Sequence, residues 1–211
     1  MYNQVDAVLS AHVSPHKQSR DTRLVFDSNV GLTMQIVESR VLPFSFKATA
    51  DALWTVSVCH EYQTVCRETK KVDIHTATSD MMSKSFEGML VVPQKSAEVH
   101  VKIALQRFNE PNRVILVHHI LNDPKNIAGK PVCGAMMRHQ SWTVLEQGPH
   151  DSTLMRVYHT ATPDVYGPTS EVQSTLYTLT NFVLLVVQAH LDLDLRQLED
   201  LLLCSDNALN I

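Results

Sequence analysis

The sequence predicts an α+β fold in which a curved antiparallel sheet wraps around a long C-terminal helix. Two patterns carry this prediction. Residues 84–161 contain successive strand patterns at hairpin spacing, which cannot form the crossover connections of a parallel sheet. Residues 170–204 have apolar side chains at helical spacing, and the middle of this segment is apolar nearly all round, so we expect a helix buried on several sides. A sheet bent around a helix tends to leave space that can hold an apolar ligand.

The composition agrees with this class. Valine, threonine and isoleucine make up 48 of the 211 residues, and β-branched residues suit pleated, half-buried surfaces. Apolar residues make up 44% and charged residues 19%, which is an ordinary globular balance. The net charge of -4 argues against a protein held to nucleic acid by a broad positive field. The 6 glycines are too few to favour phosphate-cradling loops.

The first 80 residues predict short elements of alternating type. Residues 1–13 have apolar side chains on one face of a helix, and residues 14–21 form a polar connector in which a proline ends that helix. Residues 32–36 alternate between apolar and polar, which is typical of a half-buried strand. Residues 46–60 have helical spacing of apolar side chains. Residues 61–80 fit no single element.

Strand patterns then follow one another up to the last helix. They cover residues 86–92, 99–106, 114–121, 140–146 and 153–161. Residues 122–134 are rich in Pro, Gly and Asn and predict a loop. Ser170 and Gln173 have capping-box spacing, which indicates that the last helix begins there.

The hairpin around residues 109–112 gives the first candidate site residues. A turn that closes at Asn109 and Asn112 predicts four facing pairs: Arg107 with Val114, Leu105 with Leu116, Ile103 with His118, and Val101 with Ile120. This face is apolar except for Arg107 and His118. In a ligand cavity these two would be the polar groups that fix orientation. In the alternative interpretation, Arg107 lies at the rim in solvent and His118 is a hydrogen-bonded core residue.

The opposite face of this hairpin is not wholly polar. Ile115, Val117 and Leu121 are expected to point outward there. Because an exposed apolar patch is unfavourable, we expect the N-terminal helix or a partner chain to cover them.

The second hairpin adds aromatic and aliphatic candidates. Trp142 and Val144 are expected to share a face with Met155 and Val157, although a slip of one residue in the loop would reverse the two faces. On the terminal helix, Leu179, Val183 and Val186 fall on the stripe expected to face the sheet.

Three segments resemble the START-like, helix-grip superfamily of lipid and hydrophobic-ligand binders. They are Leu42-Pro43-Phe44 leading into residues 49–54, the strand Ser141-Trp142-Thr143-Val144-Leu145-Glu146, and the long helix after Ser170. The resemblance covers residues 22–205, so residues 1–21 are expected to form an N-terminal helix and linker, and residues 206–211 a tail. It implies a cavity between the sheet and the C-terminal helix that binds a sterol, phospholipid, fatty acid or similar molecule.

We therefore expect a non-catalytic protein that binds a lipid or another hydrophobic small molecule. The cavity-lining candidates are Val101, Ile103, Leu105, Arg107, Leu116, His118, Trp142, Val144, Met155, Leu179, Val183 and Val186. Two alternatives remain. One is a cyclase or hydrolase on the same fold, with His118 as acid or base and Arg107 as an electrostatic aid. The other is a protein-interaction module whose cavity is filled.

No metal, cofactor or nucleic-acid partner is expected. His60 and Glu61 begin the pattern H-E-x-x-H, but Thr64 occupies the position of the second histidine that zinc needs. None of the four cysteines lies two residues from another, and we expect reduced thiols.

The sequence predicts a cytoplasmic location. The N-terminus has no basic region followed by an apolar run, so no secretory signal is expected. The longest uncharged apolar stretch, residues 176–191, is too short and too polar to span a bilayer. The sequence allows transient contact with a membrane and identifies no protein partner.

Overall fold

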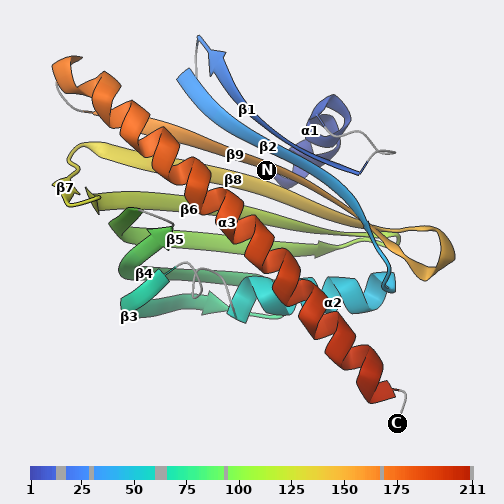
Figure 1. The fold of residues 1–211 in the computed structure, drawn as a ribbon. Helices are drawn as coiled ribbons and strands as arrows, with labels where there is room; N and C mark the ends of the chain where they lie inside the picture. The colour runs from blue at the N-terminus through green and yellow to red at the C-terminus, as the bar shows by residue number, and fades with distance from the viewer. Residues whose placement is uncertain (13–17, 29–30, 60–65, 93–94, 167–168, 210–211) are drawn as a thin grey trace.

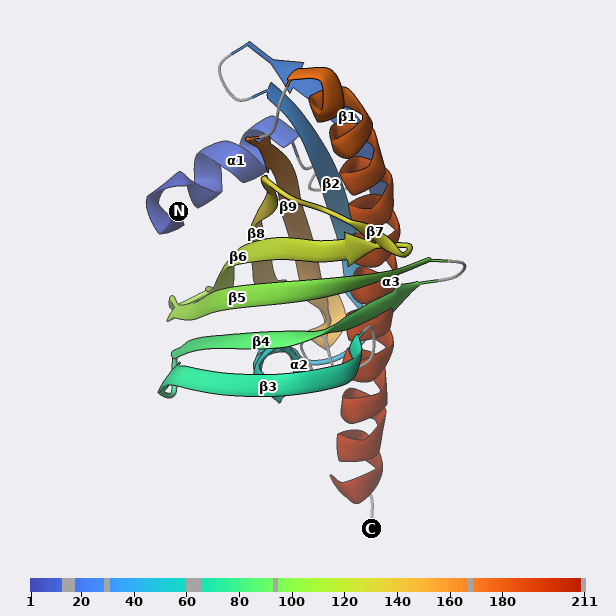
Figure 2. The same cartoon turned by 90° about the vertical axis from the view of Figure 1, so that its left-hand side faces the viewer.

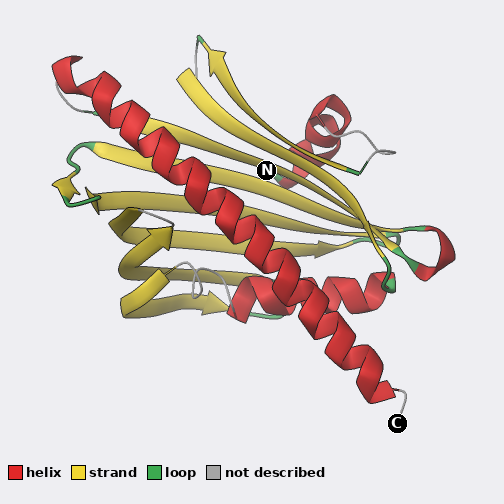
Figure 3. Cartoon of the chain, in the orientation of Figure 1, coloured by secondary structure: helices red, strands yellow, loops and turns green. Residues whose placement is uncertain are grey.

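The computed structural model describes residues 1–12, 18–28, 31–59, 66–92, 95–166 and 169–209 (Figure 1). Its helices are α1 (Val5–His12), α2 (Phe46–Cys59) and α3 (Thr169–Leu209). Its strands are β1 (Ser19–Asp27), β2 (Gly31–Leu42), β3 (Cys66–Ala77), β4 (Met81–Val92), β5 (Lys95–Asn109), β6 (Arg113–Ile127), β7 (Lys130–Pro131), β8 (Ala135–Gln147) and β9 (Thr153–Val165). Sheet and helices follow one another along the chain in an order typical of an α+β protein (Figure 3).

The strands form one antiparallel sheet in the order β1-β2-β9-β8-β6-β5-β4-β3, with the short β7 paired to β6. The sheet curves, and α3 runs across one of its faces, whereas α1 lies against the other (Figure 2). This confirms the predicted curved antiparallel sheet with a long C-terminal helix. It also confirms that the strands between residues 84 and 161 pair consecutively, apart from the inserted β7.

The main core lies between the sheet and α3. Leu179, Val183 and Val186 are each less than 5% exposed, as the helical stripe predicted. The helix α2 contacts α3 and contributes Leu53 and Val56 to the same core. The core is thus a three-part contact between the sheet, α2 and α3.

A second, smaller core lies on the other face of the sheet. Val5 and Leu9 of α1 are buried against Ile115 and Val117 of β6. Two of the three apolar residues predicted to point outward, Ile115 and Val117, are therefore covered by the N-terminal helix, which is one of the two covers that the sequence predicted, whereas Leu121 does not belong to this core. The face of the sheet beneath α1 is consequently apolar.

The β5–β6 hairpin has the predicted faces but not the predicted partners. Arg107 pairs with Leu116, Leu105 with His118, and Ile103 with Ile120, because the turn closes at Asn109 and Val114. The predicted pairing was wrong by two residues. Since side chains alternate with a period of two, this shift leaves every side chain on its predicted face.

The β8–β9 hairpin reverses a prediction. Trp142 pairs with Tyr158 and Val144 with Arg156, so the predicted facing of Trp142 and Val144 with Met155 and Val157 was wrong. Both residues belong to the core under α1. The 3-10 turn Pro149–Asp151 sets this register, which differs by one residue from the predicted one.

Several connections are strands rather than loops. The predicted loop over residues 122–134 was wrong in part, because β6 continues to Ile127 and passes through Pro124 beside a register irregularity in β5. Proline is tolerated in a strand at such an irregularity. Residues 66–77 form the edge strand β3, and Ser19–Asp27 form β1, which begins inside the predicted linker. The positions His60, Glu61 and Thr64 lie outside the described residues.

Candidate functional site

A cavity of about 80 Å3 lies between the sheet and α3, with α2 at one end. Strands β2, β6, β8 and β9 form its floor, and the two helices form its roof. The residues that line it are Glu38, Leu53, Ser57, His118, Ile120, Asn122, His139, Ser141, Thr143, Met155, Val157, His159, Val183, Val186, Val187, His190, Leu191, Asp194, Leu195 and Leu198.

The floor and the roof differ in chemistry. The helix α3 contributes mainly Val and Leu side chains, whereas the strands contribute histidine, serine, threonine and asparagine. Because strand residues alternate, these polar side chains point inward from β6, β8 and β9 together. The cavity therefore has an apolar wall opposite a hydrogen-bonding wall, which is an arrangement that can orient a ligand.

Four histidines surround the cavity: His118 on β6, His139 on β8, His159 on β9 and His190 on α3. His139 Nδ1 lies 3.2 Å from His159 Nε2. Burial, together with the neighbouring His190 and His119, lowers the pKa of His139 to about 3. Burial and the neighbouring His139 likewise hold the pKa of His159 well below its usual value. Both rings are therefore neutral near pH 7, and one donates the hydrogen bond that the other accepts.

Two buried polar atoms of the cavity wall have no hydrogen-bond partner among the described residues. They are His139 Nε2 and Asn122 Oδ1, and each of these residues is less than 7% exposed. Ile120 pairs with His139 across the β6–β8 ladder, and Asn122 is two residues further along the same face of β6. The two residues are thus diagonal neighbours on one face of the sheet, a relation in which residues lie roughly 7–8 Å apart and their side chains can converge. Buried polar groups normally find partners, so this pair indicates a place for a bound group or water.

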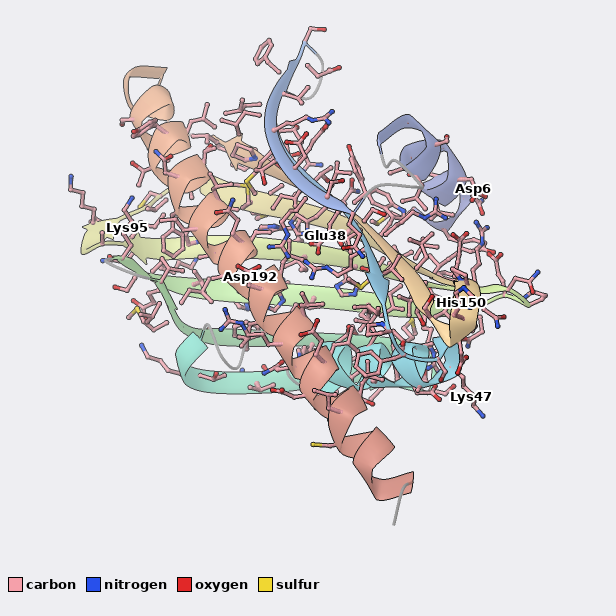
Figure 4. All side chains as sticks on the ribbon, turned by 45° about the vertical axis from the view of Figure 1, so that its right-hand side comes forward. Asp6, Glu38, Lys47, Lys95, His150 and Asp192 are labelled. Carbon is pink, nitrogen blue, oxygen red and sulfur yellow. The ribbon has the colours of Figure 1, made fainter. Side chains whose placement is uncertain are left out.

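Glu38 is the buried charge of the floor. It is 3% exposed and accepts hydrogen bonds from the Arg20 guanidinium at 2.7 Å and from the Arg40 guanidinium at 2.6 Å. Arg20 also pairs with Asp192 on α3, and Figure 4 labels Glu38 on the sheet and Asp192 on the helix. Because two guanidinium groups meet two carboxylates, this network carries no net charge and ties the start of the sheet to α3.

The roof holds an acid–base pair. His190 Nε2 lies 3.2 Å from Asp194 Oδ2, one helical turn further along α3. Both residues line the cavity. A carboxylate in this position can orient an imidazole.

The structure brings together only part of the predicted site. His118, Met155, Val183 and Val186 line the cavity. The other predicted aliphatic residues belong to the apolar core around it: Val101, Ile103, Leu105, Leu116 and Leu179. Trp142 and Val144 lie on the opposite face of the sheet.

Arg107 lies away from the cavity lining. Its guanidinium is 3.3 Å from Asp80 Oδ1 and 3.6 Å from Asp51 Oδ1, and it lies 5.0 Å from the ring centroid of Trp54. Its side chain is 16% exposed and ion-paired, so Arg107 is neither part of the cavity lining nor free in solvent.

Sequence reasoning missed most of the polar lining. Glu38, Asn122, His139, Ser141 and His159 were not among the predicted site residues, and Asn122 was assigned to a loop. The signal that could have identified them is the apolar residues between them, which pack under α1. A strand with one face under a helix and the other in a cavity reverses the ordinary polar-out pattern.

A wider hollow of about 420 Å3 lies on the other face, between residues 1–3 and strands β4 to β6. None of its lining residues has a buried side-chain polar atom that lacks a partner within the described part of the chain. The smaller cavity is therefore the better candidate site.

The helix α3 has an unusual apolar content. One stretch of it, Ser174–Cys204, is long and apolar enough to cross a membrane by length and composition, and 28% of that stretch's most apolar window is buried inside the molecule. A core helix passes the same test. Residues 176–191 alone are too short and too polar to span a bilayer, whereas the longer stretch Ser174–Cys204 has the length and composition to do so.

The chain is similar to several solved structures. The di-domain ARO/CYC protein StfQ of the steffimycin biosynthetic pathway matches with a TM-score of 0.51 and 7% identity, over 83% of this chain and 52% of that chain. The protein TTHA0849 from Thermus thermophilus matches at 0.45 and 13%, over 81% and 98%. A STAR-related lipid transfer protein from Xanthomonas axonopodis matches at 0.41 and 12%, over 75% and 94%.

These likenesses concern the fold alone. The chain has the helix-grip, START-like fold, with the curved antiparallel sheet around a long C-terminal helix that defines it. Neither a family model nor a curated protein sequence matches the chain.

Proposed function

We propose that this protein binds a small, largely apolar molecule in the cavity between the sheet and α3, without transforming it. The observation that carries the proposal is the pair of buried polar atoms, Asn122 Oδ1 and His139 Nε2, that face an apolar helix wall across an internal space. Apolar walls with a few converging polar groups are typical of ligand sites.

The volume limits what can bind without rearrangement. At about 80 Å3 the cavity is smaller than the roughly 300–1,000 Å3 of ordinary ligand pockets. A large lipid would therefore need α3 to move away from the sheet. A compact ligand, or one that enters while α3 shifts outward, agrees better with this geometry than a long acyl chain does.

Native mass spectrometry of the purified protein, followed by solvent extraction, tests the proposal. We expect a bound molecule that is released on unfolding. The variant Ser141→Leu places a larger side chain in the cavity and should reduce the bound fraction. Ser10→Leu, on the exposed surface of α1, is the matched control and should keep it. If folded, delipidated wild-type protein takes up no apolar probe, the proposal is wrong and an interaction module is favoured.

A catalytic role is the second candidate, and the His190–Asp194 pair favours it. In that case His190 would move a proton to or from the bound molecule, and Asp194 would orient the ring. The variant His190→Gln should then lower turnover by about 100-fold or more. A binder would return the supplied molecule with unchanged mass, in the wild type and the variant alike.

A further inference from the structure

The charges around the cavity restrict its ligand. Glu38 and Asp194 line the cavity, whereas no Lys or Arg appears among the described lining residues. Arg20 and Arg40 are close by, but both are engaged with Glu38, and Arg20 also with Asp192. An anionic ligand would thus add a further negative charge to a buried space whose described lining offers no lysine or arginine to pair it, which is unfavourable.

Two of the four lining histidines, His139 and His159, do not change this balance. His139 and His159 form a hydrogen-bonded pair in which burial favours the neutral rings. A neutral imidazole offers one donor and one acceptor rather than a positive charge. The floor of the cavity therefore suits a group that can both donate and accept a hydrogen bond.

The two atoms without partners specify the group further. Asn122 Oδ1 is an acceptor and needs a donor, and His139 Nε2 is an acceptor or a donor according to its tautomer. A hydroxyl can donate to the amide oxygen and complete its second hydrogen bond at the imidazole. An ionised carboxylate has no proton to give to Asn122 Oδ1.

We propose that the ligand is a neutral apolar molecule carrying a hydroxyl group, which donates a hydrogen bond to Asn122 Oδ1 and makes a second one with His139 Nε2. This inference rests on the proposed function of the cavity. The apolar remainder of the ligand lies against Val183, Val186 and Leu195 of α3.

Three probes with the same ring system test the proposal on wild-type protein at neutral pH. They are 2-naphthol, ionised 2-naphthoate and naphthalene, with affinities measured by fluorescence titration of the delipidated protein. We expect 2-naphthol to bind most tightly and 2-naphthoate to bind about tenfold more weakly or worse, because only the latter buries an unpaired charge.

A substitution at Asn122 tests whether this residue causes the preference for 2-naphthol. Asn122→Leu keeps a similar side-chain shape but removes the acceptor, so it should weaken 2-naphthol about tenfold and leave naphthalene within about twofold. The control is Asn126→Leu, on the same strand but outside the cavity lining, which should change neither affinity. Circular dichroism establishes that each variant is folded.

The outcomes separate the two proposals. If no probe binds folded wild-type protein, the proposed function fails. If the probes bind but 2-naphthoate is as tight as 2-naphthol, the function stands and the hydroxyl inference is overturned. Equal losses of 2-naphthol and naphthalene in Asn122→Leu would also overturn it. The wild-type comparison decides the question even if a variant does not fold.

Discussion

At the scale of single residues, the most informative feature is the amount of polarity that the molecule buries. Glu38, Asn122, His139 and His159 are each less than 10% exposed, and all line one cavity. Each costs desolvation free energy, which a hydrophobic residue of similar size would avoid. At Glu38 the hydrogen bond from Arg20 offsets this cost. Asn122 Oδ1 and His139 Nε2 have no such partner among the described residues, so the cost is not offset there.

The Glu38 network gives the first prediction. Glu38→Gln keeps the size but removes the charge that pairs Arg20 and Arg40. Since both arginines are about a quarter to a third exposed, water moderates the loss, and we expect about 1–3 kcal/mol of stability to disappear in urea unfolding. Asp21→Asn breaks an exposed pair with Arg23 and should cost less than about 0.5 kcal/mol. Equal effects would show that Glu38 is not a buried anchor.

The histidine pair gives the second prediction. In the unfolded chain each histidine binds a proton near its usual pKa of 6.5, whereas folded His139 does so only near a pKa of about 3, and His159 well below 6.5. Between these values the unfolded state holds more protons, so stability is complete above pH 6.5 and falls as the pH is lowered. The loss between about pH 7 and about pH 5 should be about 2 kcal/mol for His139, and His159 adds to it in the same direction.

Urea unfolding at several pH values measures this slope. His139→Gln should flatten it in part, because one of the three histidines whose pKa burial lowers, His119, His139 and His159, is removed. His100→Gln, on the other face of β5, is the control and should leave it unchanged. A slope that persists fully in His139→Gln would mean that other groups dominate the acid sensitivity.

At the scale of elements, the orientation of β8 decides what the cavity contains. Its Ser141 and Thr143 face α3, whereas Trp142 and Val144 face α1. Trp142 Nε1 donates a hydrogen bond to the Met1 carbonyl at 3.1 Å, which fixes the N-terminus on this face. The large aromatic residue is therefore part of the support for α1 rather than of the ligand site.

The third prediction tests this orientation with neighbouring residues. Trp142→Phe loses the hydrogen bond to Met1 and some packing, so it should cost about 1–2 kcal/mol of stability and leave probe affinity unchanged. Thr143→Leu should change probe affinity, because Thr143 lines the cavity. Fluorescence titration of both variants provides the comparison. The reverse pattern would mean that β8 has the opposite face toward α3.

A comparison of β5 with β8 shows what the sequence could and could not predict. Alternation in β5 placed Val101, Ile103 and Leu105 on the inner face correctly, because the outer positions between them are mostly polar. Alternation failed in β8, since its residues from Ser141 to Leu145 are all buried and periodicity alone does not say which face holds the cavity. The register between β8 and β9 is fixed by the turn Pro149–Asp151, in which His150 has a positive φ of 55°. Few non-glycine residues adopt this conformation, so the sequence pattern did not predict the turn.

Other elements were predictable to different degrees. The helix α2 was predicted to within one residue, because its apolar spacing is regular and Ser45 precedes it as a cap. The edge strand β3 was not predicted, since its exposed charged and apolar residues are set by its place at the edge of the sheet. The polar cavity wall required knowledge of pairing between distant strands, which local patterns do not contain.

At the scale of the whole molecule, the position of α3 holds the fold and the site together. It closes the cavity, packs on α2, and is tied to β1 through Arg20 and Asp192. Its sequence is apolar enough to cross a membrane, yet it lies across the sheet with one face buried and another exposed. Two successive residues distinguish these faces, because Val186 is 4% exposed and Leu185 is 39% exposed.

The last prediction uses these two residues. Val186→Asp would bury an unpaired carboxylate between α3 and the sheet, and we expect it to cost several kcal/mol and prevent soluble expression. Leu185→Asp, one residue earlier, turns toward solvent and should lower stability by about 1 kcal/mol or less, with probe binding retained. Soluble yield and thermal unfolding measure both. Two equally damaging substitutions would indicate a helix surrounded by apolar material on every side, as in a membrane, whereas two tolerated ones would mean that α3 does not pack on the sheet.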